Sequence, residues 1–386
     1  MTRPLTICAV SGSRADYGLL VSPLRAILKD PTFQLQIVLT GQHLVASAGD
    51  TAAQVRRDGF DIAAAVDLGL ADDSAAGVTV SAARALEGMA GTLKALNPDL
   101  LLLLGDRYEI LCCAIAATIA RIPIAHIAGG DVTDGAIDDS FRHAVTKMAQ
   151  IHFVTDEAAA RRVRQLGEDA SRVHLVGSPG LDLVRQTPVP TREAFFASIG
   201  AVSNGNPLLL VTFHPVTRTG DSLGQLGSLL DALASFPGAT LLFTGSNADP
   251  EGRRIEERIK AFVAACDAAY FAPSLGTENY FAALSYADAV IGNSSSGIYE
   301  APSFGVPTVN IGDRQKGRSM ARSIIAAIPE RNAIVSAIRE ALTVGRQSTE
   351  NPYGDGYASE KIVAVLKSIG DPERLLIKHF VDLHCA

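Results

Sequence analysis

Short hydrophobic runs alternate with amphipathic segments along both halves of the chain, and polar turn residues follow most of the runs. Continuous hydrophobic runs separated by helical patterns are typical of parallel strands that helices cover on both faces. The pattern therefore predicts two sets of alternating strands and helices. We expect strands at residues 5–10, 35–40, 100–104, 122–127, 151–154 and 173–176 in the first half, and at 208–213, 240–243, 269–271, 289–291 and 308–311 in the second.

The alternation weakens between residues 177 and 207, where three prolines and a Ser-Asn-Gly-Asn cluster interrupt it. Pro and Gly in such density mark loops rather than strands or helices. We therefore expect an N-terminal Rossmann-like domain at 1–185 and a C-terminal Rossmann-like domain at 186–355.

A second break, at residues 351–356, precedes a helical pattern at 359–369. We expect residues 356–386 to cross back to the first domain. Ligands of open α/β sheets bind beyond the carboxyl ends of the strands, which predicts a shared central cleft between the two domains.

The net charge of the chain indicates which kinds of binding partner are unfavourable. The chain of 386 residues has a formal net charge of −7 and no run of clustered Lys and Arg, which argues against a nucleic-acid or anionic membrane partner. The hydrophobic stretch at 110–120 is shorter than the ~20 residues that a membrane helix needs. The run at 5–10 is too short for a secretory signal, so we expect a cytoplasmic protein. The five cysteines have no metal spacing, which predicts no metal site.

The loop after the first expected strand has the features of an anion site. It combines small residues, Ser11 to Ser13, with Arg14 and leads into a helical pattern. The N–H groups at a helix N-terminus carry about half a positive charge, to which Arg14 adds a full one. The alternative is a capped turn with a surface arginine. Neither G-x-G-x-x-G nor G-x-x-x-x-G-K-[ST] occurs in the chain, which lowers the expectation of a dinucleotide enzyme or a P-loop NTPase, and we expect no cofactor.

Acidic residues follow two strands of the first half. Asp106 and Arg107 come directly after the third expected strand, and Asp131 and Asp138 follow the fourth. Clustered carboxylates raise one another's pKa, which suits the removal and return of a proton near neutral pH. The alternatives are a strand-end salt bridge between a carboxylate and the arginine of the segment 105–109, and helix capping by Asp138 or Asp139.

The second half offers a candidate nucleotide site. His214 follows a strand, where an imidazole can hold a phosphate or carry a proton, although a structural role is the alternative. Asn247 lies in a Gly-Ser-Asn turn after the next strand, and Glu300 can accept both hydroxyls of a ribose. Hydroxyl groups and bare backbone for phosphate oxygens come from Ser294, Ser295, Ser296 and Gly297.

Taken together in this order, these segments resemble a family of enzymes, the hydrolysing UDP-N-acetylglucosamine 2-epimerases of the sialic and legionaminic acid pathways. The resemblance covers nearly the whole chain, and it implies an α/β fold of GT-B type, with two Rossmann-like domains whose parallel sheets face a central cleft that holds UDP. It rests on Gly-Ser-Arg-Ala-Asp-Tyr at 12–17, Gly-Asp-Arg-Tyr-Glu at 105–109, the segment 126–147, Phe-His-Pro-Val-Thr at 213–217, the segment 292–300 and Gly-Asp-Arg-Gln at 312–315.

The resemblance also implies a mechanism without nicotinamide. A carboxylate removes the C2 proton, UDP leaves C1 by anti elimination, and water adds to the resulting 2-acetamidoglucal to give N-acetylmannosamine. By position, Asp106 and Asp138 match the catalytic carboxylates of the family, and His214 matches its histidine near the diphosphate. The positions that match UDP contacts are Arg14, His43, Ser294, Ser295, Glu300 and Arg314.

One position departs from the family pattern. Relatives commonly carry glutamate in or beside the His-x-x-Gly-Gly loop, whereas this chain has Ala128 before the glycines and Asp131 after them. Asp131 is one methylene shorter than glutamate and is a further candidate for the acid or base. The choice of base among Asp106, Asp131 and Asp138 stays open.

Other outcomes fit the same motifs. A non-hydrolysing 2-epimerase returns the mannose-configured UDP sugar through the same glucal. A retaining GT-B glycosyltransferase shares the fold and the UDP site but needs an acceptor, and a binding protein keeps the site without turnover. The substrate is either UDP-N-acetylglucosamine or UDP-2,4-diacetamido-2,4,6-trideoxyglucose, and the resemblance implies a homodimer or homotetramer.

Overall fold

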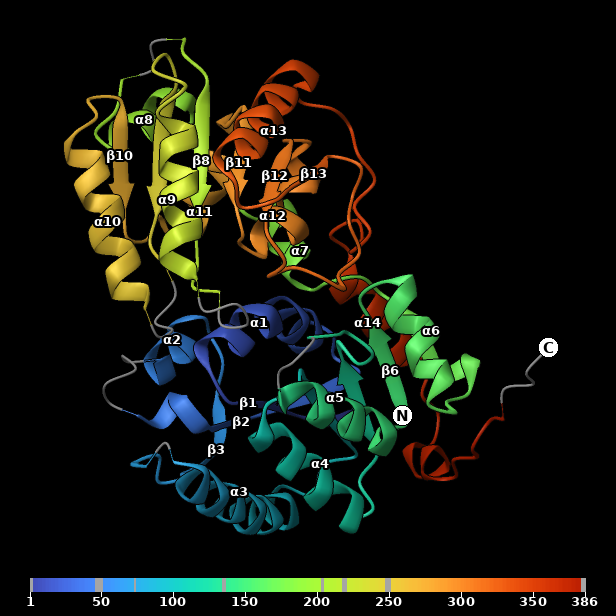
Figure 1. Ribbon diagram of the computed structural model, residues 1–386. Helices are drawn as coiled ribbons and strands as arrows, with labels where there is room; N and C mark the ends of the chain where they lie inside the picture. The colour runs from blue at the N-terminus through green and yellow to red at the C-terminus, as the bar shows by residue number, and fades with distance from the viewer. Residues whose placement is uncertain are drawn as a thin grey trace. The chain divides into compact units, whose positions relative to one another are not determined.

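Two compact units make up the computed structural model, which describes residues 3–45, 51–72, 74–133, 137–202, 205–216, 221–246 and 251–382. Unit 1 is Met1–Asp182 together with Tyr353–Ala386, and unit 2 is Leu183–Pro352. Each unit contains one parallel sheet with helices packed against it (Figure 1), which confirms the predicted α/β class.

Strands and helices alternate through most of unit 1. Its strands are β1 (Leu5–Ser11), β2 (Phe33–Thr40), β3 (Ile62–Val66), β4 (Leu100–Leu104), β5 (Ile124–Ile127), β6 (Ile151–Val154) and β7 (Val173–Leu175). Its helices are α1 (Arg14–Lys29), α2 (Thr51–Arg57), α3 (Ala75–Leu96), α4 (Tyr108–Ile119), α5 (Ile137–Met148), α6 (Glu157–Gln165) and α14 (Ala358–Lys367), and α7 (Gly180–Gln186) leads into unit 2. None of the helices in the described ranges is long and apolar enough to cross a membrane.

The sheet of unit 1 has the strand order β3-β2-β1-β4-β5-β6-β7, with all neighbouring strands parallel. From β1 the chain first builds the sheet outward through β2 and β3, and then returns to add β4 on the other side of β1. The loops that follow β1 and β4 therefore diverge at the centre of the sheet. This switch point is where doubly wound sheets bind their ligands.

Strand β4 explains why helices must cover both faces of this sheet. All five of its leucines are buried, and successive side chains of a strand point to opposite faces. Leu101 and Leu103 pack in one hydrophobic cluster with residues of α3, α4 and α5, while α1 packs against β1, β2 and α14. Because the middle of the strand is closed to water on both sides, polar groups gather in the loop at its end.

Unit 2 repeats the same plan with the strand order β10-β9-β8-β11-β12-β13, again all parallel. Its switch point lies between β8 and β11. The strands are β8 (Leu208–Thr212), β9 (Thr240–Thr244), β10 (Ala269–Ala272), β11 (Ala289–Gly292), β12 (Thr308–Ile311) and β13 (Ile324–Ala327). The helices are α8 (Arg192–Ser198), α9 (Ser222–Leu233), α10 (Gly252–Ala264), α11 (Gly276–Tyr286), α12 (Ser296–Tyr299) and α13 (Arg331–Val344).

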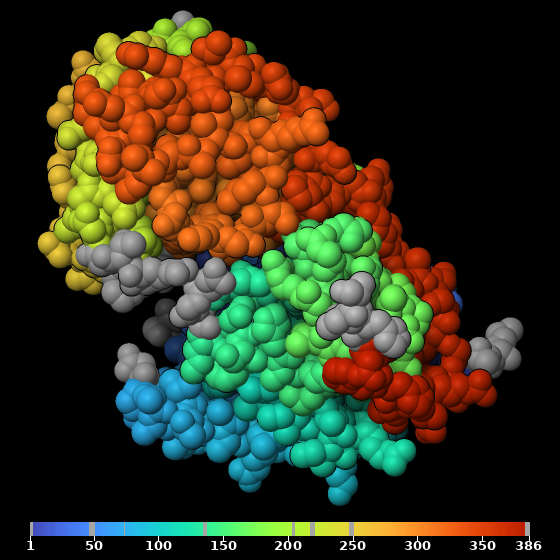
Figure 2. Space-filling view, turned by 45° about the vertical axis from the view of Figure 1, so that its right-hand side comes forward, coloured from blue at the N-terminus to red at the C-terminus, as the bar shows by residue number. Residues whose placement is uncertain are grey.

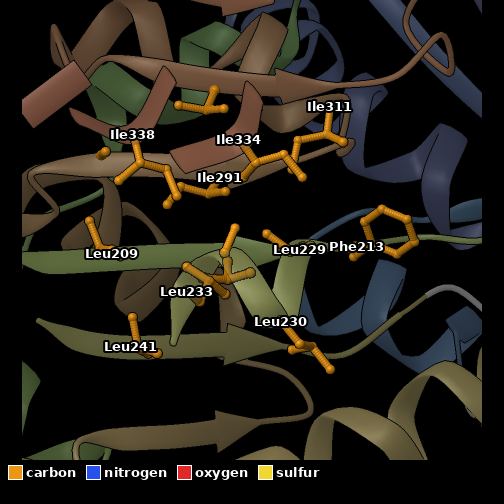
Figure 3. Close-up of a cluster of buried hydrophobic side chains, with 14 of the residues drawn as sticks. Leu209, Phe213, Leu229, Leu230, Leu233, Leu241, Ile291, Ile311, Ile334 and Ile338 are labelled. Atoms are coloured by element: carbon orange, nitrogen blue, oxygen red, sulfur yellow. The ribbon is translucent and has the colours of Figure 1, made fainter. Parts of the chain in front are cut away.

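A hydrophobic cluster closes one face of the sheet in unit 2 (Figure 3). Leu209 of β8 and Ile291 of β11 meet leucines of α9, and Ile334 and Ile338 of α13 pack over the same strands. Burying a side chain of this size contributes about 1.5–3 kcal/mol. The cluster therefore fixes β8 and β11 side by side, and with them the two loops that leave the switch point.

Two strands were not predicted from the sequence, and both lie at a sheet edge. β3 (Ile-Ala-Ala-Ala-Val) and β13 (Ile-Ile-Ala-Ala) are partly exposed and rich in alanine, a residue that is depleted in strands, so their hydrophobic runs do not by themselves indicate a strand. The expected break at 177–207 also contains two short helices, α7 and α8. Elsewhere the predicted strands coincide with observed ones to within about two residues, the ordinary uncertainty of such boundaries.

The C-terminal segment, residues 371–382, is tied to unit 1 by a buried carboxylate. The Glu168 side chain is fully buried and accepts hydrogen bonds from Lys147 (2.7 Å), His152 (3.0 Å) and Lys378 (2.7 Å). Figure 2 shows this segment, in red, packed against the green surface that contains α6. Burial alone would raise the pKa of Glu168, but the three donors outweigh it and lower the pKa to about 2.

Glu168→Gln should destabilise unit 1 by about 3 kcal/mol, because it removes the buried charge that pairs with Lys378 and Lys147. The contribution of the carboxylate is complete above its ordinary pKa of 4.5 and is lost as the pH falls toward about 2. Denaturant unfolding of both proteins between pH 7 and pH 2 measures this difference. Glu87→Gln, on an exposed position of α3, serves as the control. Equal stabilities of wild type and Glu168→Gln at neutral pH would contradict the assignment.

Candidate functional site

The loop after β1 is held by a cap and by a buried glutamate. Ser13 caps α1, and its Oγ accepts a hydrogen bond from the Asp16 N–H at 3.2 Å, while Arg14 is exposed. The fully buried carboxylate of Glu109 lies against Gly12, so that a Cβ at this position would come within 2.7 Å of Glu109 Oε1. Glycine is therefore required at position 12 for the loop to close over Glu109.

His43 lies in a short 3₁₀ turn after β2 and makes both of its ring contacts inside unit 1. Nε2 lies 2.9 Å from Ser11 Oγ, and Nδ1 lies 2.9 Å from Thr51 Oγ1. Burial lowers the pKa of His43, so the ring is neutral at physiological pH. A direct contact between this ring and a ligand would require one of these two hydrogen bonds to be exchanged.

Asp106 and Arg107 are neighbours in the loop after β4, but they form ion pairs with different residues. Arg107 Nε donates to Glu109 Oε1 at 2.5 Å, and Asp106 pairs with Arg142 of α5. The predicted alternative, a strand-end salt bridge between a carboxylate and an arginine of this segment, is present between Arg107 and Glu109, whereas Asp106 pairs outside the loop. Burial raises the pKa of Asp106, the Arg142 charge opposes this shift, and the nearby charge of Asp138 adds to it.

Asp131 and Asp139 contact Arg142, the residue that pairs with Asp106. Asp131 Oδ1 accepts a hydrogen bond from the Thr155 hydroxyl at 2.6 Å, and its backbone carbonyl accepts one from Arg142 at 2.8 Å. Asp139 accepts from the Thr133 N–H at 2.9 Å, so it ties Thr133 to α5. The structure thus brings the loops that carry Asp106 and Asp131 together at the N-terminal end of α5.

A buried histidine supports the loop that carries Asp106. His126 of β5 is fully buried, and its Nε2 lies 2.7 Å from the Gly105 carbonyl oxygen. Burial lowers the pKa of His126 to about 3, so the ring stays neutral and donates this hydrogen bond. The backbone directly before Asp106 is thereby fixed to the neighbouring strand.

Two charged residues of this site were not identified as candidates from the sequence. Arg142 is one, and Asp16 is the other: Asp16 Oδ2 is buried without a hydrogen-bond partner in the described part of the chain. Burial raises the pKa of Asp16 to about 6, and Arg107 and Glu109 are among the charges that act on it. The available signal for Arg142 was its position four residues after Asp138, which places both on one face of a helix.

In unit 2, Asn293 joins the loops that leave β8, β11 and β12. Its Oδ1 accepts from the His214 N–H at 2.7 Å, and its Nδ2 donates to the His214 carbonyl at 2.9 Å. The Asn293 carbonyl accepts from Gln315 at 2.7 Å and from Arg314 at 3.3 Å. The buried side-chain amide of Asn293 thus sets the position of His214, and the backbone carbonyl of the same residue holds Arg314 and Gln315.

The segment after β11 carries the predicted serines and Glu300. Ser294, Ser295 and Ser296 are partly exposed around the short helix α12, and the hydroxyl of Tyr280 donates to Ser296 Oγ at 2.6 Å. Glu300 ends this turn, with Oε2 buried and unpartnered among the described residues. Burial raises the pKa of Glu300 to about 7, against the lowering effects of Ser296 and the Arg318 charge.

Gly297, Asn247 and a metal site are the remaining points of the sequence prediction. Gly297 is buried inside α12, where a Cβ would come within 2.8 Å of Thr308 Cγ2. Asn247, together with Thr217 of the histidine motif, lies outside the described residues. Within the described ranges, no group of three His, Cys, Asp or Glu side chains is arranged to hold a metal ion.

These features define a class: an α/β protein of GT-B type, built from two doubly wound units whose polar residues gather where the strands end. The chain belongs to the UDP-N-acetylglucosamine 2-epimerase family, whose model matches residues 25–367. The resemblance predicted from the sequence motifs is thereby confirmed.

Curated relatives and solved structures agree with this assignment. The UDP-N,N'-diacetylbacillosamine 2-epimerase (hydrolyzing) of Legionella pneumophila is 34% identical over 96% of this chain and 98% of its own length. Polysialic acid biosynthesis protein P7 of Escherichia coli is 34% identical over 98% of this chain and 97% of its own. The crystal structure of UDP-GlcNAc 2-epimerase from Neisseria meningitidis bound to UDP-GlcNAc has a TM-score of 0.74 at 16% identity, covering 95% of this chain and all of that one.

Proposed function

We propose that the protein is a hydrolysing UDP-N-acetylglucosamine 2-epimerase, which converts UDP-N-acetylglucosamine and water into N-acetylmannosamine and UDP. The observation that carries the proposal is the arrangement at the switch point of unit 1. There the Asp106 carboxylate and the Asp131 loop meet at Arg142, and the charge of Asp138 acts on Asp106. Inversion at C2 needs a group that removes a proton and a group that returns one to the other face, which two or three carboxylates supply.

The proposed reaction balances in two steps. In the first, a carboxylate takes the C2 proton, the C2–H electron pair forms a C1=C2 double bond, and the C1–O bond breaks with its electrons leaving on UDP. In the second, a carboxylate takes a proton from water as the water oxygen bonds to C1 of the 2-acetamidoglucal, and the C1=C2 electron pair forms the new C2–H bond with a proton that a carboxylic acid delivers from the opposite face. A positioned acid or base contributes about 10² to 10⁴ in rate. We assign these proton transfers to Asp106, Asp131 and Asp138.

The departing UDP carries negative charge that must be stabilised. We assign the diphosphate to the polar loops of unit 2, with His214 and Arg314 near it, and the ribose to Glu300. Donors aimed at a leaving group stabilise the charge that develops in the transition state. The further binding residues that we assign are Arg14, His43, Arg107, Asn247, Ser294, Ser295, Ser296 and Gly297.

A second candidate substrate is UDP-2,4-diacetamido-2,4,6-trideoxyglucose, which would undergo the same reaction. This alternative is favoured by the full-length Legionella relative, whose name specifies UDP-N,N'-diacetylbacillosamine. The word hydrolyzing in that name supports release of the free sugar rather than of a UDP sugar.

Proton NMR of the purified protein in D₂O tests the proposal, with each of the two UDP sugars in a separate sample. Deuterated free N-acetylmannosamine together with UDP is the expected result. A deuterated mannose-configured UDP sugar would instead assign the protein to the non-hydrolysing branch. Turnover of only the 4-acetamido-6-deoxy sugar would select the second substrate. Absence of any product from both sugars would overturn the proposal and favour a transferase or a binding protein.

Replacing each carboxylate separates chemistry from binding. Asp106→Asn, Asp131→Asn and Asp138→Asn should each lower turnover by about a hundredfold or more, because each removes a group that transfers a proton. UDP affinity, measured by calorimetry, should persist in all three. Asp61→Asn, at an exposed position, is the control. Near-normal rates in all three site variants would rule out the carboxylate mechanism.

UDP binding should become tighter as the pH rises through about 7, because the ribose hydroxyls donate to the ionised form of Glu300. Glu300→Gln should lower UDP affinity by about tenfold at high pH and reduce the dependence on pH. Calorimetry in buffers of different ionisation enthalpy reports the proton released on binding. Arg314→Ala should weaken binding at every pH, and the exposed Glu278→Gln should match wild type. A Glu300→Gln protein with unchanged affinity and pH dependence would refute the ribose assignment.

A further inference from the structure

Arg142 is the point at which two strand-end loops are fastened to α5. Its Nη2 donates to the Asp106 carboxylate and to Thr133 Oγ1 at 3.0 Å, and its Nη1 donates to the Asp131 carbonyl at 2.8 Å and to Asp139 at 3.2 Å. The side chain is only 8% exposed. Each terminal nitrogen thus serves one carboxylate and one neutral oxygen, so the guanidinium cannot turn without breaking contacts to both loops.

A buried guanidinium needs an ionised partner. Arginine does not lose its proton in proteins, so its charge stabilises the ionised form of the carboxylates that it contacts, here Asp106 and Asp139. Protonation of Asp106 would remove the charge that Nη2 faces and would add a hydroxyl where donors already converge. The pair therefore favours the ionised form of Asp106, and it fixes the direction in which the carboxylate points.

Burial is the largest influence on the pKa of Asp106 and raises it, and the charge of Arg142 is the main influence that opposes this shift. Asp138 on α5 and Asp16 on α1 are like charges that oppose ionisation, while Arg107 on the same loop favours it. The hydrogen bonds of Arg142 go to Asp106 and Asp139 rather than to Asp138. The carboxylates Asp106 and Asp138 repel each other. Of the two, Asp106 is the one that contacts the buried guanidinium of Arg142.

We propose that Arg142 is a positioning residue that holds the Asp106 carboxylate, ionised, against the Asp131 loop and thereby makes Asp106 the base that takes the C2 proton. This inference rests on the proposed function for the identity of the reaction. The protonation state of Asp106 does not depend on that function, because it follows from contacts within unit 1.

The experiment measures the Asp106 carboxyl directly. Protein labelled with ¹³C-aspartate is titrated by NMR, and the Asp106 signal is identified by its loss in Asp106→Asn. In Arg142→Gln the pKa of Asp106 should rise, because the cation that favours ionisation is gone. In Arg162→Gln the pKa of Asp106 should stay at its wild-type value. Arg162 of α6 donates to the Gly130 carbonyl at 3.0 Å, so this control loosens the same loop without removing a partner of Asp106.

Kinetics provide the second readout. In Arg142→Gln the acidic limb of the kcat/KM profile should move to higher pH in step with the Asp106 titration, and kcat/KM at neutral pH should fall by about tenfold or more. UDP affinity should stay at the wild-type value, since no UDP contact is removed. Arg142→Lys keeps a cation but cannot serve both loops, so its acidic limb should stay in place while kcat falls.

The outcomes separate the two proposals. An Asp106 titration that is identical in wild type and Arg142→Gln would overturn the role of Arg142, whatever the activity. If Arg142→Gln does not fold, Arg142→Lys decides: lowered kcat with an unmoved acidic limb supports the inference, and wild-type kcat overturns it. If the wild type turns over neither UDP sugar, the proposed function fails, and the NMR titration still decides whether Arg142 holds Asp106 ionised.

Discussion

Parallel strands that are buried on both faces impose the constraint on which the rest of this structure depends. A strand such as β4, all leucine and fully buried, leaves its ends as the only places where polar groups can meet solvent or ligand. In parallel sheets all of the carboxyl ends lie along one edge. The reversal of strand order beside β1 and beside β8 then opens that edge at one position in each unit. The residues of both candidate sites follow from this geometry.

Within each unit, a single buried polar side chain fixes the loops that meet at the edge. In unit 1 it is the guanidinium of Arg142, and in unit 2 it is the amide of Asn293. A buried donor or acceptor that loses its partner costs about 1–3 kcal/mol, and more when it is charged. The loops therefore have one arrangement that satisfies every bond of these side chains. A charged group suits the loops that carry carboxylates, whereas a neutral amide adds no charge beside His214.

Buried polar side chains need hydrogen-bond partners, and this requirement gives Glu109 and His43 structural roles that their positions in the family motifs do not reveal. Glu109 lies against Gly12 and holds Arg107, so it shapes the loops after β1 and β4 together. His43 is neutral and bonded at both ring nitrogens to hydroxyls of unit 1. Both residues maintain the frame of the site through contacts inside unit 1.

The sequence by itself determined the α/β class, most of the strands, and the loops where chemistry is expected. It did so because burial on two faces and helical periodicity are local properties of the chain. It missed β3 and β13, since these partly exposed edge strands are rich in alanine, which does not favour a strand over a helix. Only the tertiary structure decided that Asp106 pairs with Arg142 rather than with its neighbour Arg107, and that Arg107 pairs with Glu109. The partner of a charged side chain depends on which elements the sheet brings together, and Asp106 and Arg142 lie 36 positions apart, so the chain around either residue contains no local signal for their pairing.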